Sequence, residues 1–189
     1  DLEIRGAGSL LGEIQSGHLE QVGYDTYCNL LDEVVKEMQG TEIEPDIDIQ
    51  IDLNVTSYIP DEYIEDSAQK IEIYQNIALC RKEEDIQNVV DEIIDRFGNM
   101  PAELENLLDI ARIKYLAKPF SISKIASKRT AVVFTFEQSK YEIDLQKLLK
   151  TYKNRIKFSP GIKTMITLEI GTTNERQILN DVTEFLKQL

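Results

Sequence analysis

Residues 47–54, with the sequence IDIQIDLN, alternate apolar and polar side chains without a break. Successive side chains of a β-strand point to opposite faces of its sheet, so this stretch predicts a half-buried strand. Asp48, Gln50 and Asp52 are expected to face water. The side chains expected on the buried face are Ile47, Ile49, Ile51 and Leu53.

Three apolar stripes at helical spacing follow this strand. They predict helices over about 66–81 and 84–97, and a third helix that opens at Pro101 and ends before Pro119. Gly98 would stop the second helix. The side chains expected to point inward are Ile71, Tyr74, Ile77 and Ala78, then Ile86, Val89, Val90, Ile93, Ile94 and Phe97, then Leu104, Leu107, Leu108, Ala111 and Tyr115.

The last third of the chain changes to strand composition. Stretches 122–127, 131–137, 156–159 and 164–170 predict strands, and Pro160-Gly161 is a turn pair between the last two. Asp144 would cap a short helix, and Thr173 or Asn174 would cap a final one, with Ile178, Leu179, Val182, Phe185 and Leu186 on its buried face. The sequence leaves the order of these strands open.

The residues before the strand form a different region. Residues 24–38 carry one apolar stripe that predicts a helix ending near Gly40, and Pro45 lies in an acidic connector. We therefore expect an α+β chain in which a loop-helix segment, residues 1–42, precedes a compact domain, residues 43–189. This domain would combine a three-helix layer with a mixed β-sheet.

The charge of the chain is unevenly distributed. The net charge is −13, with nine acids and no base in residues 41–68, but twelve bases and seven acids in residues 119–189. DNA binding draws most of its affinity from Lys and Arg, so the acidic first two thirds argue against an independent DNA-binding domain. The basic run of Lys147, Lys150, Lys153, Arg155 and Lys157 could contact phosphates, although such a run is more often a solvated face.

Catalytic residues are not evident in the sequence. His18 is the sole histidine, and no GKS or GKT phosphate loop is present. Cys28 and Cys80 belong to no CxxC pair and fit two reduced thiols in a cytoplasmic protein. We expect no catalytic residue, no metal site and no membrane span, since no stretch approaches about 20 apolar residues.

The first seventeen residues, DLEIRGAGSLLGEIQSG, contain four glycines and two polar side chains that can form several hydrogen bonds, Arg5 and Gln15. Gly6, Gly8, Gly12 and Gly17 suit a loop that approaches another surface closely, although a plain linker would also use glycine. Arg5 offers a planar fork of donors, and Gln15 offers a donor and an acceptor.

This pattern resembles the second half of the translocation motif shared by RecG-type helicases and bacterial transcription-repair coupling factors. The matching positions are Arg5, Gly6, Gly8, Leu10, Leu11, Gly12, Gln15 and Gly17. The resemblance implies that Arg5 and Gln15 couple ATP turnover to movement along duplex DNA in an intact motor. It also implies that this chain is a piece of a larger protein.

Residues 91–98, DEIIDRFG, hold a second constellation. Glu92, Asp95 and Arg96 lie three and four residues apart, so they would share a helix side opposite Ile93, Ile94 and Phe97. They could be a solvated face with one local ion pair, or a docking surface for complementary charges.

The stretch from Asp52 to Pro119 is similar to the C-terminal module of transcription-repair coupling factors. The similarity is carried by Tyr58-Ile59-Pro60-Asp61, Glu72-Ile73-Tyr74, residues 91–98 and residues 107–112. In that family the module packs on an N-terminal module that resembles the repair protein UvrB. This packing masks the UvrA-binding surface and restrains the motor. The resemblance assigns Glu92, Asp95 and Arg96 to this contact.

The resemblance also implies the setting of the parent protein. The motor would use ATP and magnesium, engage duplex DNA and displace stalled RNA polymerase, whereas the fragment itself would need no cofactor. The alternative is an auxiliary nucleic-acid-binding domain of a superfamily 2 helicase.

Overall fold

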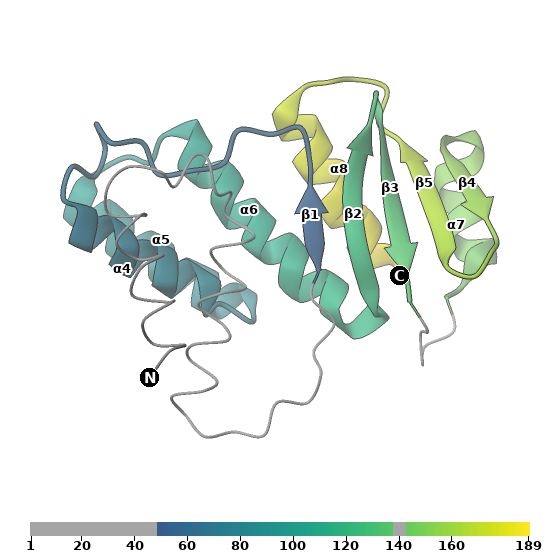
Figure 1. Cartoon of the computed structure of the whole chain (residues 1–189), viewed down its shortest axis with the longest axis horizontal. Helices are drawn as coiled ribbons and strands as arrows, with labels where there is room; N and C mark the ends of the chain where they lie inside the picture. The colour runs from purple at the N-terminus through teal and green to yellow at the C-terminus, as the bar shows by residue number, and fades with distance from the viewer. Residues whose placement is uncertain (1–48, 138–142) are drawn as a thin grey trace, which may run out of the picture. The chain divides into compact units, whose positions relative to one another are not determined.

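The structure is a computed structural model that describes residues 49–137 and 143–189 (Figure 1). The described residues form five α-helices and one five-stranded mixed sheet, so the predicted α+β class is confirmed. They divide into two compact units, which we call unit 1 (residues 57–111) and unit 2 (residues 49–56 and 112–189). The predicted loop-helix segment lies outside the described residues, and the boundary near residue 42 stays a prediction.

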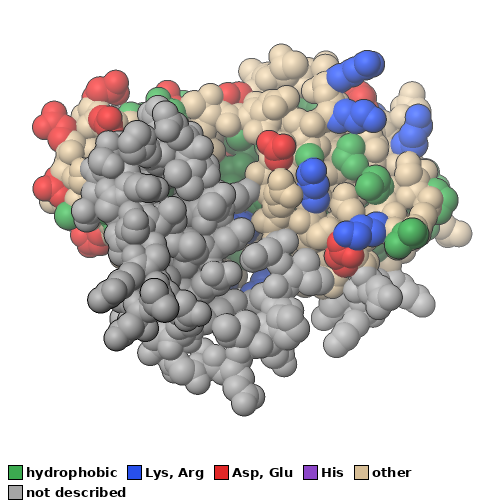
Figure 2. All heavy atoms as spheres, in the orientation of Figure 1, with side chains coloured by type: hydrophobic (Ala, Val, Ile, Leu, Met, Phe, Trp, Pro, Cys, Tyr) green, Lys and Arg blue, Asp and Glu red, His purple; other side chains and the backbone are tan. Residues whose placement is uncertain are grey.

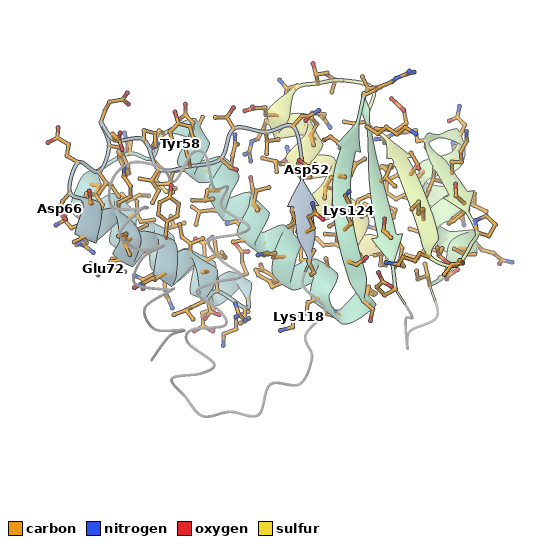
Figure 3. The ribbon with its side chains drawn as sticks, viewed as in Figure 1. Asp52, Tyr58, Asp66, Glu72, Lys118 and Lys124 are labelled. Carbon is orange, nitrogen blue, oxygen red and sulfur yellow. The ribbon has the colours of Figure 1, made fainter. Side chains whose placement is uncertain are left out.

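Unit 1 is helical. Its helices are α4 (Ser67–Ala78), α5 (Glu83–Phe97) and the first part of α6 (Ala102–Ala117), which continues into unit 2. Asp66 caps α4 by accepting a hydrogen bond from the Gln69 backbone N–H at 2.9 Å, and Figure 3 marks this residue. Gly98 ends α5 with a φ of 86°, which glycine adopts without a Cβ penalty.

The core of unit 1 is mostly aliphatic. The Tyr74 hydroxyl lies inside that core and accepts a hydrogen bond from the Ile59 N–H at 2.8 Å. The Cys80 thiol is buried and unoxidised, and it contacts the Asn76 carbonyl oxygen at 3.3 Å. Fully buried side chains of this unit include Ile59, Ile64, Ile73, Ile77, Ile86, Ile93 and Leu104.

Unit 2 contains the sheet, in the order β1-β2-β3-β5-β4. β1 pairs with β2 in parallel, and the other neighbours are antiparallel. The strands are β1 (Gln50–Asp52), β2 (Ile122–Lys128), β3 (Ala131–Phe136), β4 (Ile156–Ser159) and β5 (Thr164–Glu169).

Two helices cover one face of this sheet, α7 (Leu145–Tyr152) and α8 (Glu175–Gln188). Figure 1 shows both helices behind the strands. Phe185 of α8 joins the layers, because its ring lies 4.3 Å from Phe134 of β3 and 5.6 Å from Tyr152 of α7. The 3-10 turns Lys118–Phe120 and Lys153–Arg155 lead into β2 and β4.

Most of the predicted elements are confirmed, including the caps at Asp144 and Asn174 and the buried face of α8. The first strand is shorter than predicted. The Asn54 N–H donates to the Ser127 hydroxyl at 3.0 Å, and Val55 turns back onto the Leu53 carbonyl, so the ladder stops after Asp52. The alternation still holds where it is described, since Ile49 and Leu53 are buried.

One inward prediction is wrong. Ile94 is 44% exposed, whereas Ile86, Val89 and Ile93 are buried. At 100° per residue Ile94 lies about 100° from Ile93, outside the stripe that these three residues define. Phe97 is only half-buried.

Candidate docking surface on helix α5

Helix α5 has the sequence of a well-oriented surface helix. Glu83, Glu84 and Asp85 lie in its first turn and Arg96 lies in its last, as the helix dipole favours. The buried residues Ile86, Val89 and Ile93 recur at three- and four-residue steps and fix which side faces the core. The positions of the charged side chains around the axis of α5 follow from this orientation.

Arg96 is the centre of the surface. Its Nη1 donates to Glu92 Oε1 at 3.0 Å, one turn back on α5, and to Glu72 Oε1 at 3.3 Å, on helix α4. Its guanidinium also lies 5.0 Å from the centre of the Phe97 ring. These contacts hold the Arg96 side chain in place, and 29% of that side chain remains exposed to solvent.

Electrostatics at this surface follow from the two carboxylates. The hydrogen bond from Arg96 to Glu92, together with the bond and the charge of Glu72, raises the pKa of Arg96 above its ordinary value, although desolvation opposes this. Arg96 is therefore a fixed cation bracketed by two acids. Because the group is solvent-accessible, we expect the pairs to orient the side chain more than to stabilise the fold.

The predicted trio does not act as one cluster. Glu92 and Arg96 meet, but Asp95 is exposed and lies about 100° from Arg96 around the helix. Among the described residues, no hydrogen bond or ion pair of the Asp95 side chain is observed. Asp95 therefore extends the charged surface away from α4.

Glu72 is the functional candidate that sequence spacing missed (Figure 3). Its sequence distance from Arg96 is 24 residues, so only the packing of α4 against α5 brings the two together. In the sequence, Glu72 belongs only to the family pattern Glu72-Ile73-Tyr74. The available sequence signal was that Glu72 is a charged residue between two apolar ones, Ile71 and Ile73, which the structure buries.

The other predicted sites have different outcomes. Arg5, Gly6, Gly8, Gly12, Gln15 and Gly17 lie outside the described residues. Within 49–137 and 143–189 no cluster of His, Cys, Asp or Glu could hold a metal ion. No helix in these same ranges is long and apolar enough to cross a membrane.

The two units carry opposite charge. The described residues of unit 1 hold fourteen acids and four bases, a net charge of −10, whereas those of unit 2 hold seven acids and fourteen bases, a net charge of +7. Figure 2 shows acidic side chains over the helices and Lys and Arg side chains over the strands. The charged surface on α5 therefore belongs to an acidic unit, which favours a cationic partner.

Comparison with known proteins gives a consistent result. The family model described as the TRCF domain matches residues 53–148. The chain is 43% identical over 134 residues to the transcription-repair-coupling factor of Staphylococcus epidermidis, which covers 70% of the chain and 12% of that protein. It is 35% identical over 195 residues to the factor of Bacillus subtilis, covering 100% of the chain and 17% of that protein.

A solved structure agrees with the fold. The crystal structure of the C-terminal domain of a transcription-repair coupling factor matches with a TM-score of 0.67, at 23% identity, over 74% of this chain and 90% of that one. This likeness concerns the fold alone. The chain spans less than a fifth of the length of the curated relatives it matches.

Proposed function

The chain belongs to the transcription-repair-coupling factor family, and from this membership we propose that it is a regulatory C-terminal module that docks on another part of its own parent protein. The docking site is the charged surface on α5, made of Glu92, Asp95 and Arg96 with Glu72 beside them. The partner is the UvrB-like N-terminal module of the parent. Docking masks the surface that recruits UvrA and restrains the motor.

The observation that supports this proposal is the state of Arg96. A flexible arginine loses side-chain entropy when it binds, whereas Arg96 is already held by Glu92 and Glu72 with part of its guanidinium accessible. Its remaining donors suit a partner carboxylate, and Glu92 and Asp95 suit partner cations. Preorganisation of this kind gives specificity at a small contact.

The strength of such a contact suits a switch. Rim and partly exposed charge pairs contribute about 0.2–1 kcal/mol each, so a few of them shift a closed arrangement without making it permanent. RNA polymerase engagement by the full-length protein would then release the module. Duplex DNA and RNA polymerase are contacted elsewhere in the parent.

The test uses the full-length parent protein. Arg96→Glu should raise basal ATPase activity and UvrA binding, because it places a third carboxylate beside Glu92 and Glu72 and removes the cation that contacts a carboxylate of the partner. Lys82→Glu is the matched control, since Lys82 is an exposed residue at the start of α5 and the substitution changes the charge equally. Unchanged ATPase and UvrA binding in Arg96→Glu, or an equal rise in the control, would reject the assignment.

The same proposal assigns no catalysis to this chain by itself. ATP and magnesium belong to the parent motor, and Arg5 and Gln15 would act there in translocation on duplex DNA. Alanine at either position should reduce translocation by the full-length protein and leave the thermal stability of this chain unchanged. We place the protein in the cytoplasm, where a buried cysteine such as Cys80 is ordinarily reduced.

A further inference from the structure

Helix α7 in unit 2 exposes two leucines that its own fold does not use. Leu148 and Tyr152 are buried on the side that faces the sheet and Phe185, but Leu145 is 45% exposed and Leu149 is 47% exposed. These two leucines are four residues apart and therefore lie one above the other on one side of the helix. They form an apolar ridge on the surface of unit 2.

The same segment is strongly basic. Residues 145–157 contain five Lys and Arg and no Asp or Glu. Arg155 is engaged within unit 2, because it donates to Asp181 at 2.8 Å and to the Glu169 carbonyl at 3.1 Å. Among the described residues, no ion pair is observed for Lys147, Lys150 or Lys153.

The cations are not equally close to the ridge. At 100° per residue, Lys150 lies about 100° from Leu149 around α7, while Lys147 lies about 160° from it. Lys153 follows the last turn of the helix. Lys150 and Lys153 therefore flank the ridge, and Lys147 projects from the other flank of α7.

Two candidate partners fit this surface poorly. Nucleic acid would gain from the lysines but not from the leucines, and the only aromatic residue of α7, Tyr152, is buried and not available for base stacking. A lipid surface is bound by a helix that buries a large apolar face, whereas the ridge on α7 consists of two leucines. A partner that offers apolar side chains together with carboxylates uses both features of the surface.

We propose that α7 is a docking surface for an acidic amphipathic helix of a partner protein. The apolar stripe of that helix packs on Leu145 and Leu149, and its flanking carboxylates contact Lys150 and Lys153. The i, i+4 ridge matches the spacing by which helices interdigitate. This surface is separate from the proposed docking surface on α5, and either proposal can fail without the other.

The probe is a synthetic peptide with the sequence of residues 83–97, EEDIQNVVDEIIDRF, acetylated and amidated at its ends. It carries six acids, one arginine and an apolar stripe at helical spacing. Labelled peptide is titrated with the 189-residue chain at low salt, and binding is followed by fluorescence anisotropy and by the gain of helical circular dichroism. We expect saturable binding that weakens as salt is added.

Substitutions locate the binding surface. Leu149→Ser should weaken binding about ten-fold, which corresponds to the loss of one partly buried leucine contact, whereas Ile162→Ser, at a fully exposed apolar residue of the β4–β5 turn, should not. Lys150→Glu should weaken binding about five-fold. Lys147→Glu makes the same charge change on the same helix and should have less than half that effect. Thermal melts verify that each variant is folded.

Several results would overturn the proposal. These are no saturable binding by the native chain, equal losses in Leu149→Ser and Ile162→Ser, or equal losses in Lys150→Glu and Lys147→Glu. A scrambled peptide of the same composition that binds as tightly would show that the charge of the peptide, and not its apolar stripe, determines binding. Displacement of the peptide by equimolar duplex DNA or by anionic lipid vesicles would assign α7 to those ligands instead.

Discussion

The two units of this chain reach stability by different routes. Unit 1 is helical, acidic and built on an aliphatic core, whereas unit 2 is a basic sheet whose core centres on Phe134, Phe136 and Phe185. The net charge of −13 therefore describes neither unit, since their described residues carry −10 and +7. The comparison shows that arguments from charge about binding partners must be made for each unit separately.

The largest effect is expected in the aromatic core of unit 2. Phe185→Ala should lower the free energy of unfolding by about 3–5 kcal/mol, because Phe185 is fully buried and its ring contacts Phe134 and Tyr152. Urea unfolding followed by circular dichroism measures this change. Ile162→Ala, at a fully exposed residue, is the control and should change stability little. A decrease of less than about 1 kcal/mol in the free energy of unfolding for Phe185→Ala would contradict the importance of this ring for packing the helices on the sheet.

A smaller effect is expected at a buried hydroxyl contact in unit 1. Tyr74→Phe removes the acceptor of the Ile59 N–H and leaves that donor buried, which should cost about 1–3 kcal/mol. Tyr63→Phe removes the hydroxyl that donates to the Gly98 carbonyl at 2.6 Å in an exposed place, and it should cost less. The two variants are compared by urea unfolding. Equal losses would show that burial does not set the cost of these bonds.

Both units place a glycine in the left-handed region, at Gly98 and at Gly171. A Cβ would meet nothing within 4 Å at either position, so Gly→Ala should cost only backbone strain, about 1–3 kcal/mol. Gly98, with a φ of 86° and a ψ of −161°, lies in a region that is adopted almost only by glycine. Thermal unfolding of the two variants measures this directly. No measurable loss of stability in either variant would contradict the assignment of strain to these positive φ angles.

The smallest effect is a pH dependence in unit 2. Lys163 lies 2.7 Å from Glu137, and this contact, with a hydrogen bond from Ser123, lowers the pKa of Glu137 from its ordinary value. A depressed carboxyl pKa stabilises the fold above the unfolded pKa, and that stability is lost as the pH falls through the folded value. Lys163→Met should raise the pKa of Glu137, which an NMR titration of its side-chain carboxyl carbon would show. An unchanged pKa in that variant would mean that Ser123 alone lowers it.

Local sequence predicted most of the elements but not how they meet. Helix ends at Asp66, Gly98, Asp144 and Asn174 could be predicted because each is set by residues next to it in the chain. The position of β1 at the edge of the sheet could not, because its parallel pairing with β2 joins residues more than 70 positions apart.

The candidate site shows the same division. Helical spacing placed Glu92 and Arg96 together, and the structure confirms that pair. Spacing could not supply Glu72, which comes from another helix. It also placed Ile94 inward, where the structure has it 44% exposed, while the assignment of Asp95 to the docking surface stays a prediction. Tertiary packing decides the position of Glu72, whereas the angles around α5 decide those of Asp95 and Ile94.

The central claim is that the charged surface on α5 binds the UvrB-like N-terminal module of the parent. Calorimetric titration of that purified module with the 189-residue chain tests it most directly. We predict saturable binding that weakens with salt, is lost or reduced at least ten-fold in Arg96→Glu, and is retained in Lys82→Glu. No binding by the native chain, or equal affinity for Arg96→Glu, would contradict the account.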